Sequence, residues 1–126
     1  MLTWEQIERE VHDHLEGVTA APPWLHSGLH GLPVAMRRAV WRGREAIKLV
    51  AFICPEARMR FAMALAIGDR LETELALLQK EHCVQFVLPV EGLTWEGLRR
   101  AIEHLLVNAR FARQDARSRA AELRTW

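Results

Sequence analysis

CVQFVLPVEGLTWEGLRRAIEHLL, the stretch from Cys83 to Leu106, contains the clearest structural signal in this chain of 126 residues. Its first part is a short apolar run that stops at Pro89, as expected for a buried strand. A short acidic turn follows, and Thr94 then provides a cap for an amphipathic helix. The apolar stripe of this helix consists of Leu98, Ile102, Leu105 and Ala109. The stretch predicts architecture, and it contains no catalytic motif.

The N-terminal part of the chain begins with another capped helix. Thr3 and Gln6 have the spacing of a capping box, and apolar residues then recur every three or four positions. This pattern predicts a helix over residues 3–16. Residues 17–33 contain repeated glycines and prolines, so we expect a loop or an irregular edge strand there.

Alternating side chains predict a β-hairpin after this segment. In the first strand, residues 34–42, Val34 and Met36 fall on one face and Trp41 falls on the other. The second strand, residues 45–54, is mostly apolar and rich in β-branched residues. A run of this kind predicts a central strand that is buried on both faces.

The middle of the chain leaves one alternative open. A proline suited to the first turn and apolar residues at four-residue spacing predict a helix over residues 56–70. Residues 72–82 then contain strong helix formers, so this helix could continue to Lys80. Because a helix of that length is unusual in a small domain, we expect instead a hairpin that pairs residues 75–79 with residues 83–88.

Together these elements predict an α+β fold, in which helices flank an antiparallel sheet. The expected order is a helix, two or three strands, a helix, two strands and a long C-terminal helix. We expect residues 1–109 to form a single domain, and residues 110–126 to form an arginine-rich helical extension.

Composition is ordinary for a soluble globular protein, and the absence of a recognisable signal or membrane span leads us to expect a cytoplasmic one. Half of the residues are apolar, and the net charge of +1 provides no overall attraction to nucleic acid or to an acidic membrane. The N-terminal sequence MLTWEQIERE lacks the regions of a secretory signal, and no apolar run approaches the roughly 20 residues needed to cross a bilayer. Cys54 and Cys83 fit buried thiols in a reducing compartment, with a single disulfide as the alternative.

No motif indicates an enzyme, a cofactor or a metal site. The sequence lacks GxGxxG, GxxxxGK[ST], GxSxG, HExxH and CxxC. His26 and His30 have a metal-ligand spacing only on a helix, which the neighbouring glycines disfavour. Cys83 follows a histidine and is the candidate nucleophile, but nothing else in the sequence would activate its thiol. We therefore expect a protein without enzymatic activity, cofactor or bound metal.

Apolar side chains exceed what a small core requires, which indicates a surface for a protein partner. The chain has five tryptophans and four methionines but no tyrosine. The candidate partner-binding residues are Val34, Met36, Trp41 and Met59. Their alternative role is to fill the core. We expect part of this surface to contact a second copy of the chain.

Arginines near the C-terminus provide a second candidate surface. The residues that fall on one face of the predicted helix are Arg110, Arg113, Arg117 and Arg124. They could contact the phosphates of a nucleic acid or an acidic partner protein. A solvated helix face is the alternative, and no aromatic residues alternate with these arginines to stack nucleotide bases.

Two consecutive segments carry a family resemblance: AMALAIGDRL, Ala62 to Leu71, and ELALLQKEHCVQFVLPVEGLTWEGLRRAIEHLL, Glu74 to Leu106. Over residues 34–108 the chain resembles the type III secretion chaperone-like fold, and more closely its bacterial YbjN-like branch. The resemblance implies a cytoplasmic homodimer without enzymatic activity. Members of the chaperone group hold an extended segment of a client protein in apolar surface grooves.

The expected function is therefore a chaperone- or adaptor-like module that acts as a homodimer and binds a segment of a partner protein. Binding of nucleic acid or an acidic partner through the C-terminal arginine face is the alternative.

Overall fold

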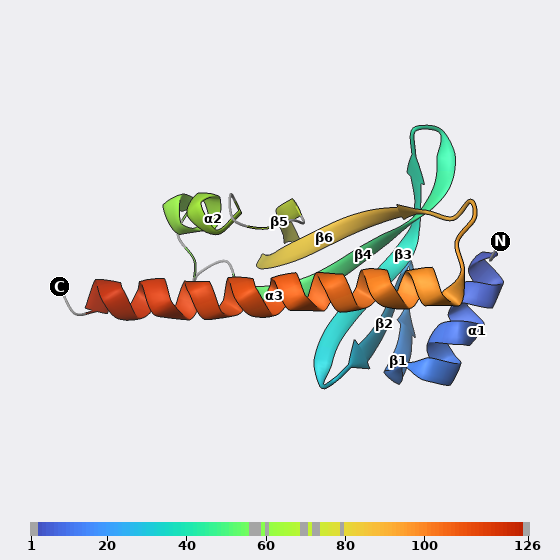
Figure 1. The fold of residues 1–126 in the computed structure, drawn as a ribbon, viewed down its shortest axis with the longest axis horizontal. Helices are drawn as coiled ribbons and strands as arrows, with labels where there is room; N and C mark the ends of the chain where they lie inside the picture. Colours follow the sequence, from blue (N-terminus) through green and yellow to red (C-terminus); the bar gives the residue numbers. More distant parts are fainter. Residues whose placement is uncertain are drawn as a thin grey trace.

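The computed structural model describes residues 3–55, 59, 61–68, 71, 74–78 and 80–124. These residues form a six-stranded antiparallel sheet, with the strand order β1-β2-β3-β4-β6-β5, and three helices (Figure 1). In chain order the elements are α1 (Trp4–His14), β1 (Glu16–Ala21), β2 (Trp24–Leu29), β3 (Leu32–Trp41), β4 (Arg44–Pro55), α2 (Phe61–Gly68), β5 (Glu74–Leu78), β6 (Glu81–Pro89) and α3 (Trp95–Arg124). The expected α+β fold is confirmed, including the long C-terminal helix.

All three helices contribute to one hydrophobic core on a single face of the sheet, which we call the helix face. The helices supply Ile7 and Val11 from α1, Ile67 from α2, and Leu98, Ile102 and Leu105 from α3. The strands supply Val34, Met36, Ile47, Leu49 and Val84 to the same core. Successive side chains of a strand point to opposite faces, so the residues between these positions lie on the other face of the sheet.

Side-chain caps fix the starts of α1 and α3. The Thr3 hydroxyl accepts a hydrogen bond from the Gln6 backbone N–H at 3.2 Å, and the Gln6 side-chain oxygen accepts one from the Thr3 N–H at 2.9 Å. The predicted capping box is therefore present. The Thr94 hydroxyl accepts a hydrogen bond from the Gly97 N–H at 3.1 Å. Each cap satisfies a donor that the first turn of a helix leaves unpaired.

Residues 17–33, where a loop or an irregular edge strand was expected, form most of two paired strands. β1 is the irregular edge strand, with a register shift between Glu16 and Thr19, whereas β2 lies inside the sheet. The turn at His30-Gly31 has φ values of 53° and 74°. Two positive φ values match the tight hairpin turn that twisted strands favour. The glycines and prolines therefore mark turns between strands and do not prevent pairing.

The two expected hairpins are present. β3 and β4 are joined by a tight turn at Arg42-Gly43, and β4 lies in the interior of the sheet between β3 and β6. β5 pairs with β6, so the chain forms a hairpin here rather than a continued helix. Of the helix expected over residues 56–70, α2 is present, and residues 56–58, 60, 69 and 70 lie outside the described residues.

Helix α3 runs through residue 110 without interruption. Its 30 residues correspond to a length of about 45 Å, and the helix extends past the end of the sheet in Figure 1. Ala112 is buried in the core, and the Arg113 guanidinium donates a hydrogen bond to the backbone carbonyl of Phe52. The start of the arginine-rich segment therefore packs against the body of the protein.

Candidate functional site

Three of the four predicted partner-binding residues lie in the core. Val34, Met36 and Met59 are 1%, 0% and 3% exposed, respectively. Val34 and Met36 point to the helix face from β3, and Met59 belongs to the same core cluster. The structure corrects these three assignments, because side chains buried beneath the helices leave nothing for a partner to contact.

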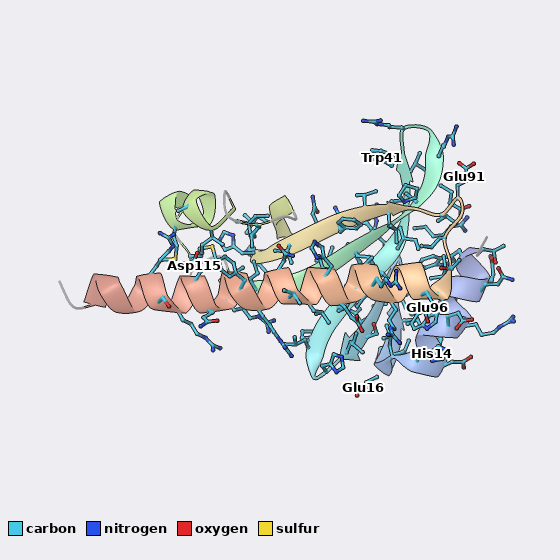
Figure 2. All side chains as sticks on the ribbon, in the orientation of Figure 1. His14, Glu16, Trp41, Glu91, Glu96 and Asp115 are labelled. Carbon is cyan, nitrogen blue, oxygen red and sulfur yellow. The ribbon has the colours of Figure 1, made fainter. Side chains whose placement is uncertain are left out.

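Trp41, the fourth predicted residue, remains at the surface. Its side chain is 44% exposed and lies near the end of the β3–β4 hairpin (Figure 2). By strand alternation, Trp41 lies on the face opposite to Val34 and Met36. The predicted set therefore combined residues from both faces of the sheet, which cannot line one surface.

The face of the sheet opposite the helices, which we call the open face, is the candidate binding surface. Near its centre Ala35, Val50 and Cys83 form a small cluster, and no helix contributes to it within the described part of the chain. These three side chains are 1%, 0% and 0% exposed, so a partner would contact the side chains around them. The partly buried side chains packed around the cluster are Trp24, Phe52, Ala76 and Leu78. A sheet face that only meets water is usually polar. The apolar character of this one indicates a surface suited to a partner.

One pair of cations interrupts the apolar open face. Arg37 on β3 and Lys48 on β4 are directly opposite each other in the strand register. The Arg37 guanidinium carbon lies 5.4 Å from the centroid of the Trp24 ring, and the buried Nε of Arg37 has no hydrogen-bond partner among the described residues. The ion pairs found in the described chain involve neither Arg37 nor Lys48.

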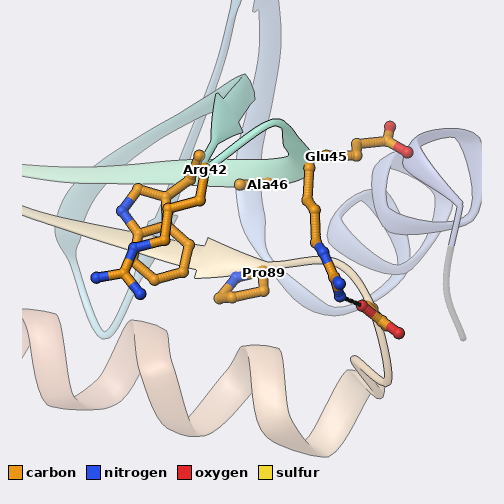
Figure 3. Close-up of a pocket in the computed structure, with 7 residues that line it drawn as sticks. Arg42, Glu45, Ala46 and Pro89 are labelled. Carbon is orange, nitrogen blue, oxygen red and sulfur yellow. Dashed lines mark hydrogen bonds and ion pairs between the residues drawn. The ribbon is translucent and has the colours of Figure 1, made fainter.

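A pocket of about 480 Å³ lies beside the turn end of the β3–β4 hairpin (Figure 3). Trp41 and Arg42 line one part of it, with the Arg42 guanidinium carbon 4.4 Å from the centroid of the indole ring. Ala46 and Pro89, which are partners in the register of β4 and β6, also line the pocket. The pocket therefore combines apolar surface with a cationic group.

The pocket and the cation pair adjoin each other on the open face. Ala46 lines the pocket and is two residues from Lys48 on β4, so both side chains point to the same face. The two acidic residues of the pocket are already paired: Glu45 with Arg38, N···O 3.0 Å, and Glu91 with Arg44. These ion pairs leave Arg37, Lys48 and Arg42 as the cations of this region that form no ion pair within the described residues.

The four candidate arginines of α3 do not form one free surface. Arg110 and Arg117 are exposed, but Arg113 is partly buried and bonded to the carbonyl of Phe52. The side chain of Arg124 lies outside the described residues. The predicted anionic-partner surface is therefore reduced to Arg110 and Arg117 in the part that the structure shows.

The cysteine and the histidines that were candidates for catalysis or metal binding are dispersed over the sheet and its turns. Cys83 is fully buried in the open-face cluster, and His82 Nε2 lies 3.2 Å from the carbonyl oxygen of Met59. His26 is on β2, and His30 is in the turn that follows it. Within the described residues, no three His, Cys, Asp or Glu side chains are grouped so that they could hold a metal ion.

None of the described helices is both long enough and apolar enough to cross a membrane.

Comparison with known proteins supports the fold. No family model and no curated protein matches the sequence. The chain is structurally similar to an uncharacterized protein from Methanothermobacter thermautotrophicus, with a TM-score of 0.66, 10% identity, and coverage of 94% of this chain and 99% of that one. It is also similar to YbjN, a putative transcription regulator from E. coli, with a TM-score of 0.59, 13% identity and 94% of each chain covered.

These similarities confirm the expected YbjN-like fold. Neither of the two matched structures is described as a type III secretion chaperone, so that part of the resemblance stays a prediction.

Proposed function

We propose that this chain is a non-enzymatic, adaptor-like binding module of the cytoplasm that holds a segment of a partner protein on the open face. One observation carries the proposal: the open face is apolar although no described helix contributes to its central cluster, whereas three helices contribute to the core on the other face. Each Å² of apolar surface that a partner removes from water contributes about 25 cal/mol. Covering this surface with a partner therefore lowers the free energy relative to leaving it in water.

The open-face side chains that a partner segment would contact are the partly buried Trp24, Phe52, Ala76 and Leu78, together with Trp41, which is 44% exposed. The neighbour YbjN is described as a putative transcription regulator, which agrees with a binding role.

Site-specific photo-crosslinking tests this proposal. A photoreactive amino acid replaces Val87, which lies opposite Lys48 on the open face, and in a control chain it replaces Asp13, which is exposed on α1. Irradiation in the host cell should give a discrete protein adduct from position 87 and not from position 13. No protein adduct at position 87, or the same adducts at both positions, would refute the proposal.

We also propose that the chain is a homodimer, with the outer side of α3 as the self-association surface. Val107 and Phe111 are one turn apart on α3 and are 63% and 38% exposed. Two copies packed through this side would shield both residues without covering the open face.

Light scattering on the full-length chain tests the dimer. The wild type should have the mass of two chains, Val107→Glu should have the mass of one, and the control His12→Glu, at an exposed position on α1, should remain dimeric. A monomeric wild type would exclude the dimer, and a dimeric Val107→Glu would exclude this interface.

Binding of an anionic partner through α3 remains the second candidate. It is supported by Arg110 and Arg117, which are exposed and belong to none of the ion pairs of the described chain. Nucleic-acid binding through this face should weaken steeply as salt increases, and Arg110→Gln with Arg117→Gln should flatten that dependence. Binding that is insensitive to this double change would remove α3 from consideration.

A further inference from the structure

The cation pair on the open face is unfavourable in the isolated chain. Arg37 and Lys48 are directly opposite each other, a geometry that brings Cβ atoms to about 5 Å, and like charges in such a pair destabilise a sheet. Their neighbours on the same face are uncharged: Val87 opposite Lys48, and Ala35, Ala39, Ala46 and Val50 on the diagonals. Among the residues that the structure describes, no neighbouring carboxylate on this face compensates the pair.

Resting on the proposed function, we infer that the partner segment is acidic and that its carboxylates pair with Arg37 and Lys48. Two cations inside an apolar surface attract an anion more strongly than two cations in water, because the apolar surroundings lower the local dielectric. A guanidinium and an ammonium side by side can both donate hydrogen bonds to carboxylate oxygens. An acidic segment thus offsets the repulsion that the free chain carries.

The geometry also predicts the spacing of acidic and apolar residues in the partner segment. Lys48 and Ala46 are two residues apart on β4, which is about 7 Å along the strand. An extended segment that lies along β4 has the same spacing between its residues i and i+2. An acidic residue at the cation pair therefore places an apolar residue two positions away at the pocket lined by Ala46 and Pro89. Arg42, on the wall of that pocket, can receive a second carboxylate.

A second copy is a less favourable occupant of the open face than an acidic segment. It carries the same two cations, and the described neighbours of the pair on this face supply no carboxylate for them.

The aromatic residues favour an acidic protein over single-stranded nucleic acid. Nucleotide bases bind by stacking on aromatic rings. A guanidinium carbon lies over one face of each indole ring, Arg37 over Trp24 at 5.4 Å and Arg42 over Trp41 at 4.4 Å from the ring centroid, so that face is not open to a base.

The test uses three labelled synthetic peptides and fluorescence anisotropy with the full-length chain. Each peptide has four repeats of Glu-Ser-Leu-Ser, Gln-Ser-Leu-Ser or Lys-Ser-Leu-Ser, which places the charged or amide residue two positions from a leucine on the same face. We call them the Glu-Leu, Gln-Leu and Lys-Leu peptides. The Glu-Leu peptide should bind at least tenfold more tightly than the Gln-Leu peptide, and the Lys-Leu peptide more weakly still. Arg37→Gln with Lys48→Gln should reduce the affinity for the Glu-Leu peptide at least tenfold and leave that for the Gln-Leu peptide unchanged. The matched control, Arg99→Gln with Arg100→Gln on α3, should change neither.

Melting curves check the fold of the variants. The double variant Arg37→Gln with Lys48→Gln should unfold in one cooperative transition, and Lys48→Gln alone should melt at or above the wild-type temperature, because it removes the repulsion. Equal affinity for the Glu-Leu and Gln-Leu peptides would overturn the inference. Tighter binding of a 20-nucleotide oligo(dT) that depends on Arg37 and Lys48 would overturn it in favour of nucleic acid. The photo-crosslinking experiment at position 87 tests the proposed function separately. It detects a protein partner of any charge on the open face, whereas the peptide experiment tests whether that partner is acidic.

Discussion

Shortening Val34 to alanine should destabilise the protein far more than the same change at Val40. Both residues belong to β3 and are separated by an even number of positions, so they point to the same face. Val34 is 1% exposed in the core, whereas Val40 is 78% exposed beyond the edge of the helices. The two variants make the same substitution in the same strand, so the difference in their stability reports mainly on burial.

The expected difference follows from two contributions. Loss of two buried methyl groups costs about 1.6 kcal/mol, at about 0.8 kcal/mol for each carbon. If roughly 40 Å³ of the space remains unfilled, the cavity adds about 1 kcal/mol. The lower strand propensity of alanine, up to about 1 kcal/mol, affects both variants and cancels in the comparison. Val34→Ala should thus be less stable than Val40→Ala by about 2–3 kcal/mol.

Urea denaturation followed by circular dichroism measures this difference, and the melting temperature should differ by about 10 °C for a domain of this size. Val40→Ala should stay close to the wild type. If the two variants unfold within about 0.5 kcal/mol of each other, a spread usual for surface substitutions, then Val34 is not a core residue. The prediction that Val34 contacts a partner would then stand.

Two further matched pairs test other parts of the structure by the same denaturation assay. Arg113→Ala should cost about 1–2 kcal/mol, because it leaves the carbonyl of Phe52 without this donor, whereas Arg110→Ala on the exposed side of α3 should cost little. Equal effects would mean that Arg113 is not anchored to β4. Gly43→Ala should cost about 1–2 kcal/mol, because φ is +74° there although no atom crowds the position. Gly97→Ala, inside α3 with only ordinary contacts, should instead stabilise by about 0.5–1 kcal/mol; the opposite order would contradict both backbone assignments.

The sequence predicted those elements whose signal is local. α1 and α3 were predictable because a threonine cap precedes an apolar stripe in each, and β3 because its side chains alternate. β2 was missed because glycines and prolines flank it closely, and these residues mark turns but do not show whether the residues between them pair. The choice between helix and strand for residues 74–78 depended on length alone.

The functional surface was less predictable because it depends on which face the helices cover. Alternation placed Val34 and Trp41 on opposite faces of one strand, but nothing local shows which face becomes the core. The cation pair had a usable signal. A two-residue turn at Arg42-Gly43 pairs Trp41 with Arg44, and the same register brings Arg37 opposite Lys48. The sequence does not show that the helices cover the other face of the sheet and leave this pair on the open face.

The open face carries several features that lower the stability of the isolated chain, and one cause accounts for all of them. Apolar side chains there remain partly in water, two cations lie opposite each other, and Arg37 Nε is buried without a partner among the described residues. Each feature is unfavourable by itself. An acidic, apolar segment laid across β3 and β4 would compensate the charge, cover the apolar surface and approach the guanidinium together. If this face met only solvent, a glutamate in place of Lys48 would stabilise the chain, because it would form an opposite-charge pair with Arg37. The like-charged pair is therefore better explained by a partner than by the stability of the fold.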